Sequence, residues 1–274
     1  MTETNDGRSF LGLLPTDDPM RFALPVRHAI TVGPPGGLFL FGGAGLAAGI
    51  AAAEAACGRP AAWAAAHYLS YARMGETLDL RVEESVRGNQ LSQARVTGTA
   101  DGREVLRVSL AMGRRDMAGE YQWTRAPDVP GPDACRDRPL WPNRDPDDLN
   151  SQVLYRVAHG RVGAERTVGG PSSDGRMVFW ARPLDPTARI DALWAAIIAD
   201  FVPSGLGHAL GADAGGNSLD NTIRLFRVPE TEWLLCEVQI HGVQAGIAHG
   251  RMNLFGVDGV LVATASQSMI VRRW

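Results

Sequence analysis

Two segments of the chain are apolar on nearly every face, and each comes before a set of alternating segments. The first reads FGGAGLAAGIAAAEAAC over residues 41–57 and favours a helix from Ala44 onward. A helix that is apolar all round must be surrounded by protein, and its small side chains let a covering sheet approach closely. Gly58, Arg59 and Pro60 end this helix, with glycine at the preferred capping position.

The residues after this helix follow the two-residue period of β-strands. Apolar and polar residues alternate over 78–82, which predicts a strand with one buried face. Residues 91–99 and 105–112 predict two more strands. The Asp101-Gly102 pair between them is typical of a tight hairpin turn, so the sheet is expected to be antiparallel.

The second half of the chain repeats this order. An apolar helical segment is expected within residues 191–210, around LWAAIIADF. Asp258-Gly259 matches the first hairpin turn, and the residues after it resemble those after Asp101 at an offset of about 157 positions. The strands predicted in this half cover residues 222–226, 233–240, 247–254 and 260–271.

A proline-rich segment lies between the two halves. Residues 124–150 contain six prolines and many charged residues, a composition typical of a linker. The predicted organisation is an N-terminal unit over 20–123, this linker, and a C-terminal unit over 151–274. Each unit has one helix followed by an antiparallel sheet that wraps around it. The predicted fold class is therefore α+β, with the hotdog arrangement present twice.

Composition narrows the classes of function. The net charge is −3, which argues against nucleic-acid binding, and every basic residue except histidine is arginine, which excludes a Schiff-base lysine. Three widely spaced cysteines form neither a disulfide framework nor a zinc motif. The first 20 residues lack the pattern of a signal peptide. We expect a cytoplasmic protein that neither spans nor binds a membrane, because the longest apolar stretch, Leu38–Cys57, is interrupted by glycines.

The common sequence motifs give little support for a dinucleotide cofactor, a catalytic serine or a metal site. Residues 43–48 match the dinucleotide fingerprint G-x-G-x-x-G/A, but no carboxylate follows about 20 positions later and the next strands are expected to be antiparallel. The chain lacks the serine-hydrolase motif G-x-S-x-G and the metal motifs H-E-x-x-H and C-x-x-C. We expect no metal and no cofactor.

Several strings resemble the type II acyl-CoA thioesterase family, whose members are double-hotdog enzymes. Phe41-Gly42-Gly43 leads into the small-residue helix, and Gln267 follows Asp258-Gly259-Val260-Leu261-Val262-Ala263 at the family's spacing. The other matching strings are Arg87-Gly88-Asn89, Asn217-Ser218-Leu219-Asp220-Asn221-Thr222 and Glu232-Trp233-Leu234-Leu235.

The resemblance implies a set of site residues. In this family an Asp, a Ser or Thr, and a Gln hold the attacking water. Asp220 falls on the Asp position as base or water acceptor, and Gln267 falls on the Gln position. An ungapped match places His241 where the family has a hydroxyl, which is a departure. We expect His241 to lie within reach of Asp220 or Gln267. Backbone N–H groups at the start of the first helix, at Gly42 and Gly43, would polarise the thioester carbonyl and bind substrate.

The expected function is hydrolysis of an acyl-CoA, with CoA entering only as part of the substrate. Unpaired sheet edges indicate a homo-oligomer. Two alternatives stay open. One is a double-hotdog hydratase or dehydratase, in which Asp220 and His241 form an acid–base pair. The other is a non-catalytic module that binds acyl thioesters.

Overall fold

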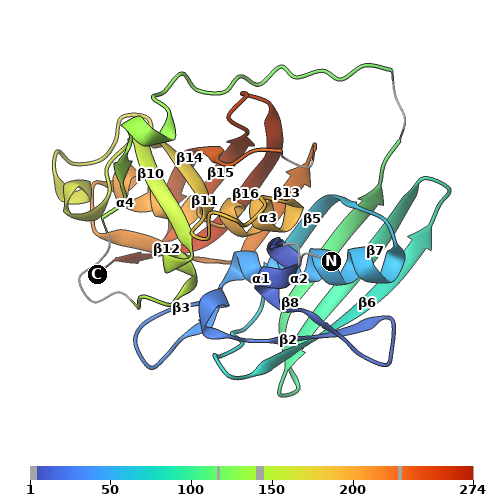
Figure 1. Ribbon diagram of the computed structural model, residues 1–274. Coiled ribbons are helices and arrows are strands. Elements are labelled where there is room, and N and C mark those ends of the chain that lie inside the picture. Colours follow the sequence, from blue (N-terminus) through green and yellow to red (C-terminus); the bar gives the residue numbers. More distant parts are fainter. Residues whose placement is uncertain (1–4, 116–117, 140–144, 228–229, 274) are drawn as a thin grey trace.

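The computed structural model describes residues 5–115, 118–139, 145–227 and 230–273. One antiparallel sheet of 14 strands continues through both halves of this part of the chain, and each half of the sheet covers its own apolar helix (Figure 1). This arrangement is the predicted double hotdog.

The N-terminal half of the sheet has the strand order β1-β2-β6-β7-β8-β5. A separate two-stranded sheet, β3 (Thr31–Val32) and β4 (Phe39–Leu40), precedes the central helix α2 (Gly42–Cys57). The other elements of this half are α1 (Gly7–Leu11), β1 (Leu14–Pro15), β2 (Arg21–Pro25), β5 (Ala61–Tyr68), β6 (Thr77–Arg87), β7 (Leu91–Ala100) and β8 (Arg103–Gly113).

The C-terminal half has the strand order β13-β16-β15-β14-β11-β10-β9, and β12 pairs with the far part of β16. Its helices are α3 (Ala192–Ala199) and α4 (Gly205–Leu210). Its strands are β9 (Arg136–Asp137), β10 (Val153–His159), β11 (Arg176–Pro183), β12 (Ala214–Ser218), β13 (Asp220–Leu225), β14 (Leu234–Gln244), β15 (Ile247–Phe255) and β16 (Leu261–Arg273).

Helix α2 is buried along most of its length, as its apolar pattern predicts. Two of its glycines set how closely the sheet approaches. A Cβ at Gly45 would lie 2.7 Å from Leu106 of β8, and a Cβ at Gly49 would lie 2.8 Å from Val108. The helix ends at Gly58, whose φ of +67° suits glycine and whose N–H donates to the carbonyl of Glu54.

The second apolar segment does not form the single helix that the pattern predicts. Asp191 caps α3 by accepting from the N–H groups of Leu193 and Trp194, and α3 ends at Ala199. A 3-10 turn that contains Pro203 separates it from α4. Ala192–Leu210 is long and apolar enough for a membrane span, but 78% of it is buried inside the protein. Because α3 ends before Asp200, the side chain of this residue is directed into the protein interior, where it meets the N-terminal half at Gly43.

Strands β5 and β13 join the halves into one sheet. They pair antiparallel, with Ile223 opposite Ala64, and α2 and α3 pack against each other beneath this junction. The predicted hairpin turns are confirmed. Asp101 and Gly102 have φ values of +46° and +73°, and Gly259 has a φ of +75°.

The described part of the proline-rich segment follows the surface as an extended chain (Figure 1). The indole N–H of Trp180 donates to the carbonyl of Pro130 over 2.9 Å, which fixes the segment to the C-terminal half. Its middle part contributes β9, which pairs with β10 at the sheet edge. The limits 20–123, 124–150 and 151–274 stay predictions, since sheet pairing crosses from one half to the other.

Candidate active site

The carboxylate of Asp200 is the centre of a buried polar cluster. Asp200 is 4% exposed and follows the last residue of α3. Its Oδ1 accepts hydrogen bonds from the side chains of Gln267, Asn221 (3.2 Å) and Ser218 (3.4 Å). Its Oδ2 accepts from the backbone N–H of Gly43 over 2.6 Å. We call Asp200, Ser218, Asn221 and Gln267 the Asp200 cluster.

Three neighbouring strands carry the partners of Asp200. Gln267 lies on β16, Ser218 ends β12 and Asn221 lies on β13, and both β12 and β13 pair with β16. The Gln267 amide also donates to the Ser218 hydroxyl over 2.7 Å, so the two side chains support one another. Gln267 and Asn221 are both fully buried. The cluster is therefore a fixed network that holds one carboxylate oxygen from three sides.

Burial raises the pKa of Asp200 to about 7. The hydrogen bonds from Gly43, Gln267, Asn221 and Ser218 favour the ionised form and oppose part of this rise. A carboxylate that titrates near neutrality exists in both protonation states at physiological pH. It can therefore take a proton from water and give it back within one reaction cycle.

A cavity of about 780 Å³ opens beside this carboxylate. Residues of both halves line it, so neither half forms it alone. The lining includes Asp200 and Ser218 of the cluster, together with Phe41, Gly42, Tyr68 and Phe201. The wall is mostly apolar, as in small-molecule sites, and its polar lining includes Asp200, Ser218 and the arginines Arg138, Arg166 and Arg272.

The start of α2 lies against the cluster. Gly43 donates its N–H to Asp200, and Gly42 lines the cavity. A Cβ at Gly42 would lie 2.7 Å from Asp200 Oδ2, and a Cβ at Gly43 would lie 2.7 Å from the Ile197 carbonyl oxygen. Both glycines therefore permit a close approach that no other residue allows. Their expected contact with substrate stays a prediction.

Of the three catalytic residues that the sequence suggests, the structure brings only Gln267 into the cluster. Asp220 lies on β13 beside Asn221, so its side chain is on the other face of the strand, where it accepts from the Ser268 N–H over 2.7 Å. The hydroxyl that contacts the carboxylate belongs to Ser218, two residues earlier. We correct the expected grouping accordingly: Gln267 meets the side chains of Asp200 and Ser218 rather than those of Asp220 and His241.

His241 lies on the exposed face of β14. Its ring centroid is 5.4 Å from that of His249, and its neighbour Ile240 is the one that points into the core. The pairing with β15 shifts register between Ile240 and Gly242. Because His241 is exposed while Gln267 is fully buried, the predicted contact of His241 with Asp220 or Gln267 is wrong.

The sequence does not identify Asp200 as a site residue, because it stands in an apolar helical pattern. The string LWAAIIADF is read as a buried helix, and its one acidic residue suggests no partner. Two signals were available in the sequence. A lone carboxylate in an apolar segment must have hydrogen-bond partners if it is buried, and Pro203 three residues later marks the end of the helix.

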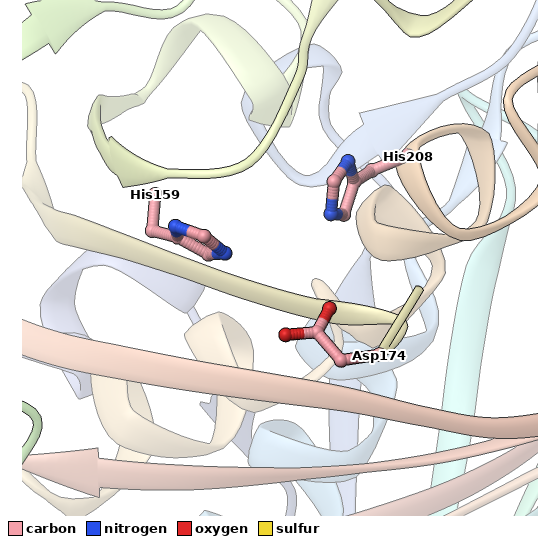
Figure 2. Close-up of side chains that lie close together, drawn as sticks. All are labelled: His159, Asp174 and His208. Carbon is pink, nitrogen blue, oxygen red and sulfur yellow. The ribbon is translucent and has the colours of Figure 1, made fainter. Parts of the chain in front are cut away.

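A second group of polar side chains lies in the C-terminal half. His159 at the end of β10, Asp174 before β11 and His208 of α4 place one possible ligand atom each within 4.8 Å of one another (Figure 2). However, Nδ1 of His208 accepts from the backbone N–H and the Nε–H of Arg161, both at 3.3 Å. The proton of the neutral ring must therefore be on Nε2, which a metal would need deprotonated. We assign no metal to this group.

Two halves that each wrap a central apolar helix, α2 or α3, and share one antiparallel sheet define the double-hotdog class. The pattern of the family "Acyl-CoA thioesterase C-terminal domain" matches residues 132–271. No curated protein matches the chain in sequence.

Solved structures agree with this class. A protein from Novosphingobium aromaticivorans DSM 12444, to which a thioesterase function has been ascribed, is 36% identical with a TM-score of 0.83. That match covers 94% of this chain and 97% of the other. Acyl-CoA thioesterase II TesB2 from Mycobacterium marinum shares the fold at 18% identity, with a TM-score of 0.71 and 98% of each chain covered. The chain belongs to the acyl-CoA thioesterase family and is a thioester hydrolase.

Proposed function

We propose that the protein hydrolyses an acyl-CoA to a free acid and CoA, with Asp200 as the general base. The observation that carries this proposal is that the two oxygens of the Asp200 carboxylate have different hydrogen-bond partners. Gln267, Asn221 and Ser218 donate to Oδ1, whereas among the described residues only the Gly43 N–H donates to Oδ2, and Asp200 lines the cavity. A water molecule bound to Oδ2 would be oriented by a carboxylate that cannot rotate.

The reaction needs only water and this network. Oδ2 takes a proton as the water oxygen bonds to the thioester carbon, which gives a tetrahedral intermediate. The carbon–sulfur bond then breaks, and the thiolate recovers the proton from Asp200. A thiol has a pKa of about 8.5, so the sulfur leaves without a strong acid. The positive end of α2 lies beside the reacting carbon and favours the negative charge that develops there.

The test is release of free thiol from a panel of short, long, branched and aromatic acyl-CoA substrates. Asp200→Asn should fold but lose about 10²–10⁴-fold in turnover, the range typical of a general base. For the wild type, kcat/KM should rise with pH through about 7, because only the ionised carboxylate accepts a proton.

A comparison with Asp220→Asn separates the two carboxylates. The asparagine oxygen can still accept the Ser268 N–H, so this variant should keep turnover within about threefold. If Asp220→Asn lost activity and Asp200→Asn kept it, the assignment of the base would be reversed.

The same experiment distinguishes the two alternative functions, a hydratase or dehydratase and a non-catalytic binding module. A lyase would change the absorbance of an enoyl thioester without releasing thiol, and a binding module would retain the acyl-CoA unchanged. The lyase alternative depends on Asp220 and His241 as a pair, and these side chains lie apart, so no observation favours it.

A further inference from the structure

The N-terminal half contributes an unexplained hydroxyl to the same cavity. Tyr68 ends β5, and its ring reaches the cavity beside the first turn of α2. Its hydroxyl oxygen is buried and has no hydrogen-bond partner among the described residues. The Asn221 amide is near enough to affect the Tyr68 pKa but lies outside hydrogen-bonding geometry. A buried hydroxyl without a partner is costly, so a ligand is expected to occupy the space that it faces.

The position of Gly42 limits the distance between the Tyr68 hydroxyl oxygen and the Asp200 carboxylate. A Cβ on Gly42 would lie 3.1 Å from the Tyr68 hydroxyl oxygen and 2.7 Å from Asp200 Oδ2. The two oxygens are therefore separated by no more than the sum of these distances, about 5.8 Å, and no direct hydrogen bond joins them. One water molecule with two hydrogen bonds of about 2.8 Å can bridge two oxygens that are up to about 5.6 Å apart, a limit close to this upper bound.

We propose that Tyr68 is a catalytic residue whose hydroxyl donates a hydrogen bond to the attacking water while that water donates to Oδ2 of Asp200. This inference rests on the proposed function. The two contacts leave one lone pair of the water for the thioester carbon and fix its direction. The sheet junction between β5 and β13 holds Tyr68 and the Asp200 cluster at a constant separation, so each half of the protein supplies one contact to the water.

The chemistry of Tyr68 suits a permanent donor. Burial, and then the charge of Asp200, raise the pKa of Tyr68 well above its ordinary value. The hydroxyl therefore keeps its proton throughout the pH range in which Asp200 ionises. It does not compete with Asp200 as a base, and the described residues offer it no acceptor within hydrogen-bonding geometry.

The test is Tyr68→Phe, which removes one oxygen and keeps the ring. We expect kcat to fall about 10–100-fold, as for loss of a positioned hydrogen-bond donor, while KM changes less than threefold. The rise of kcat/KM through about pH 7 should persist, because Asp200 is unchanged. Tm should not fall, since the hydroxyl has no protein partner to lose.

A ketone analogue, in which a methylene replaces the thioester sulfur, distinguishes contact with water from contact with the substrate carbonyl. Its affinity should be the same within twofold for the wild type and Tyr68→Phe. Weaker binding by the variant would mean that the hydroxyl contacts the carbonyl, which overturns the proposal. Unchanged kcat overturns it as well, and so does a rise in KM alone.

Tyr121→Phe is the matched control. Tyr121 is 70% exposed and is not one of the residues that line the cavity. This variant should keep wild-type kcat. If the wild type hydrolyses no acyl-CoA, the proposed function itself fails. If the wild type is active and Asp200→Asn inactive while Tyr68→Phe equals the wild type, only the role of Tyr68 is lost.

Discussion

At the scale of single residues, Asp200 combines a raised pKa with a fixed orientation. Burial supplies the first property, and three donors on Oδ1 supply the second. The two effects oppose one another, because each donor stabilises the ionised form that burial disfavours. Their balance places titration near neutrality, where a base is most useful.

The raised pKa of Asp200 makes the stability of the folded protein depend on pH. In the unfolded chain Asp200 titrates near 3.8, and in the folded protein near 7. Between these values the folded protein holds a proton that the unfolded chain has released, so raising the pH favours unfolding. The contribution is fully present below about pH 4 and is lost as the pH rises through 7. The wild type should therefore lose stability relative to Asp200→Asn between pH 5 and pH 8.

Denaturant titrations of both proteins at the two pH values measure this change. The asparagine variant acts as the reference, since the other titrating groups are common to both chains. A stability difference that stays constant with pH would contradict a buried carboxyl with a raised pKa.

At the scale of elements, the site depends on how two helices end. Helix α3 stops at Ala199, which leaves Asp200 at its C-terminal end, and α2 begins at Gly42 with the Gly43 N–H directed at that carboxylate. The contact needs a residue without a side chain at Gly43. Only then can the backbone of α2 approach the Asp200 side chain and the Ile197 carbonyl this closely.

Gly43→Ala should therefore lower both the unfolding free energy and kcat, although alanine favours helices. The added Cβ would lie 2.7 Å from both the Asp200 Cβ and the Ile197 carbonyl oxygen, so α2 must shift and the N–H bond to Asp200 must lengthen. We expect a loss of about 1–3 kcal/mol in unfolding free energy, as for overpacking. We also expect at least a tenfold loss of kcat.

Gly131→Ala is the control for this variant, because its φ is −61° and its Cβ would meet no atom within 4 Å. It should unfold and turn over like the wild type. If Gly43→Ala matched it in kcat and stability, the close contact between α2 and Asp200 would not matter for function.

At the scale of the molecule, the halves share one sheet and one cavity. Pairing of β5 with β13 continues the sheet from one half to the other, and residues of both halves line the cavity. Tyr68 comes from one half and the Asp200 cluster from the other. We therefore expect the protein to unfold in a single transition rather than half by half.

Scanning calorimetry of the wild type and Ile223→Ala tests this expectation. Ile223 is fully buried at the junction, opposite Ala64, so its truncation should cost about 2–5 kcal/mol and lower the whole transition. Val257→Ala, at a position 57% exposed, should change little. Two resolved transitions, of which Ile223→Ala moves only one, would mean that the halves unfold separately.

The sequence by itself determined the local features of this protein. Small apolar residues define α2, two-residue alternation defines the long strands, and Asp101-Gly102 and Asp258-Gly259 define hairpins, because each of these depends on near neighbours. The same information gave the double-hotdog class and, through a resemblance, Gln267.

Only the tertiary structure decided which polar residues meet. Asp200, Ser218, Asn221 and Gln267 come from four elements, and their partnership depends on where α3 stops and on the register of β12, β13 and β16. In a strand, a shift of one residue moves a side chain to the opposite face, which is why Asn221 belongs to the cluster and Asp220 does not. Near neighbours in sequence do not determine that register, because pairing between distant strands sets it.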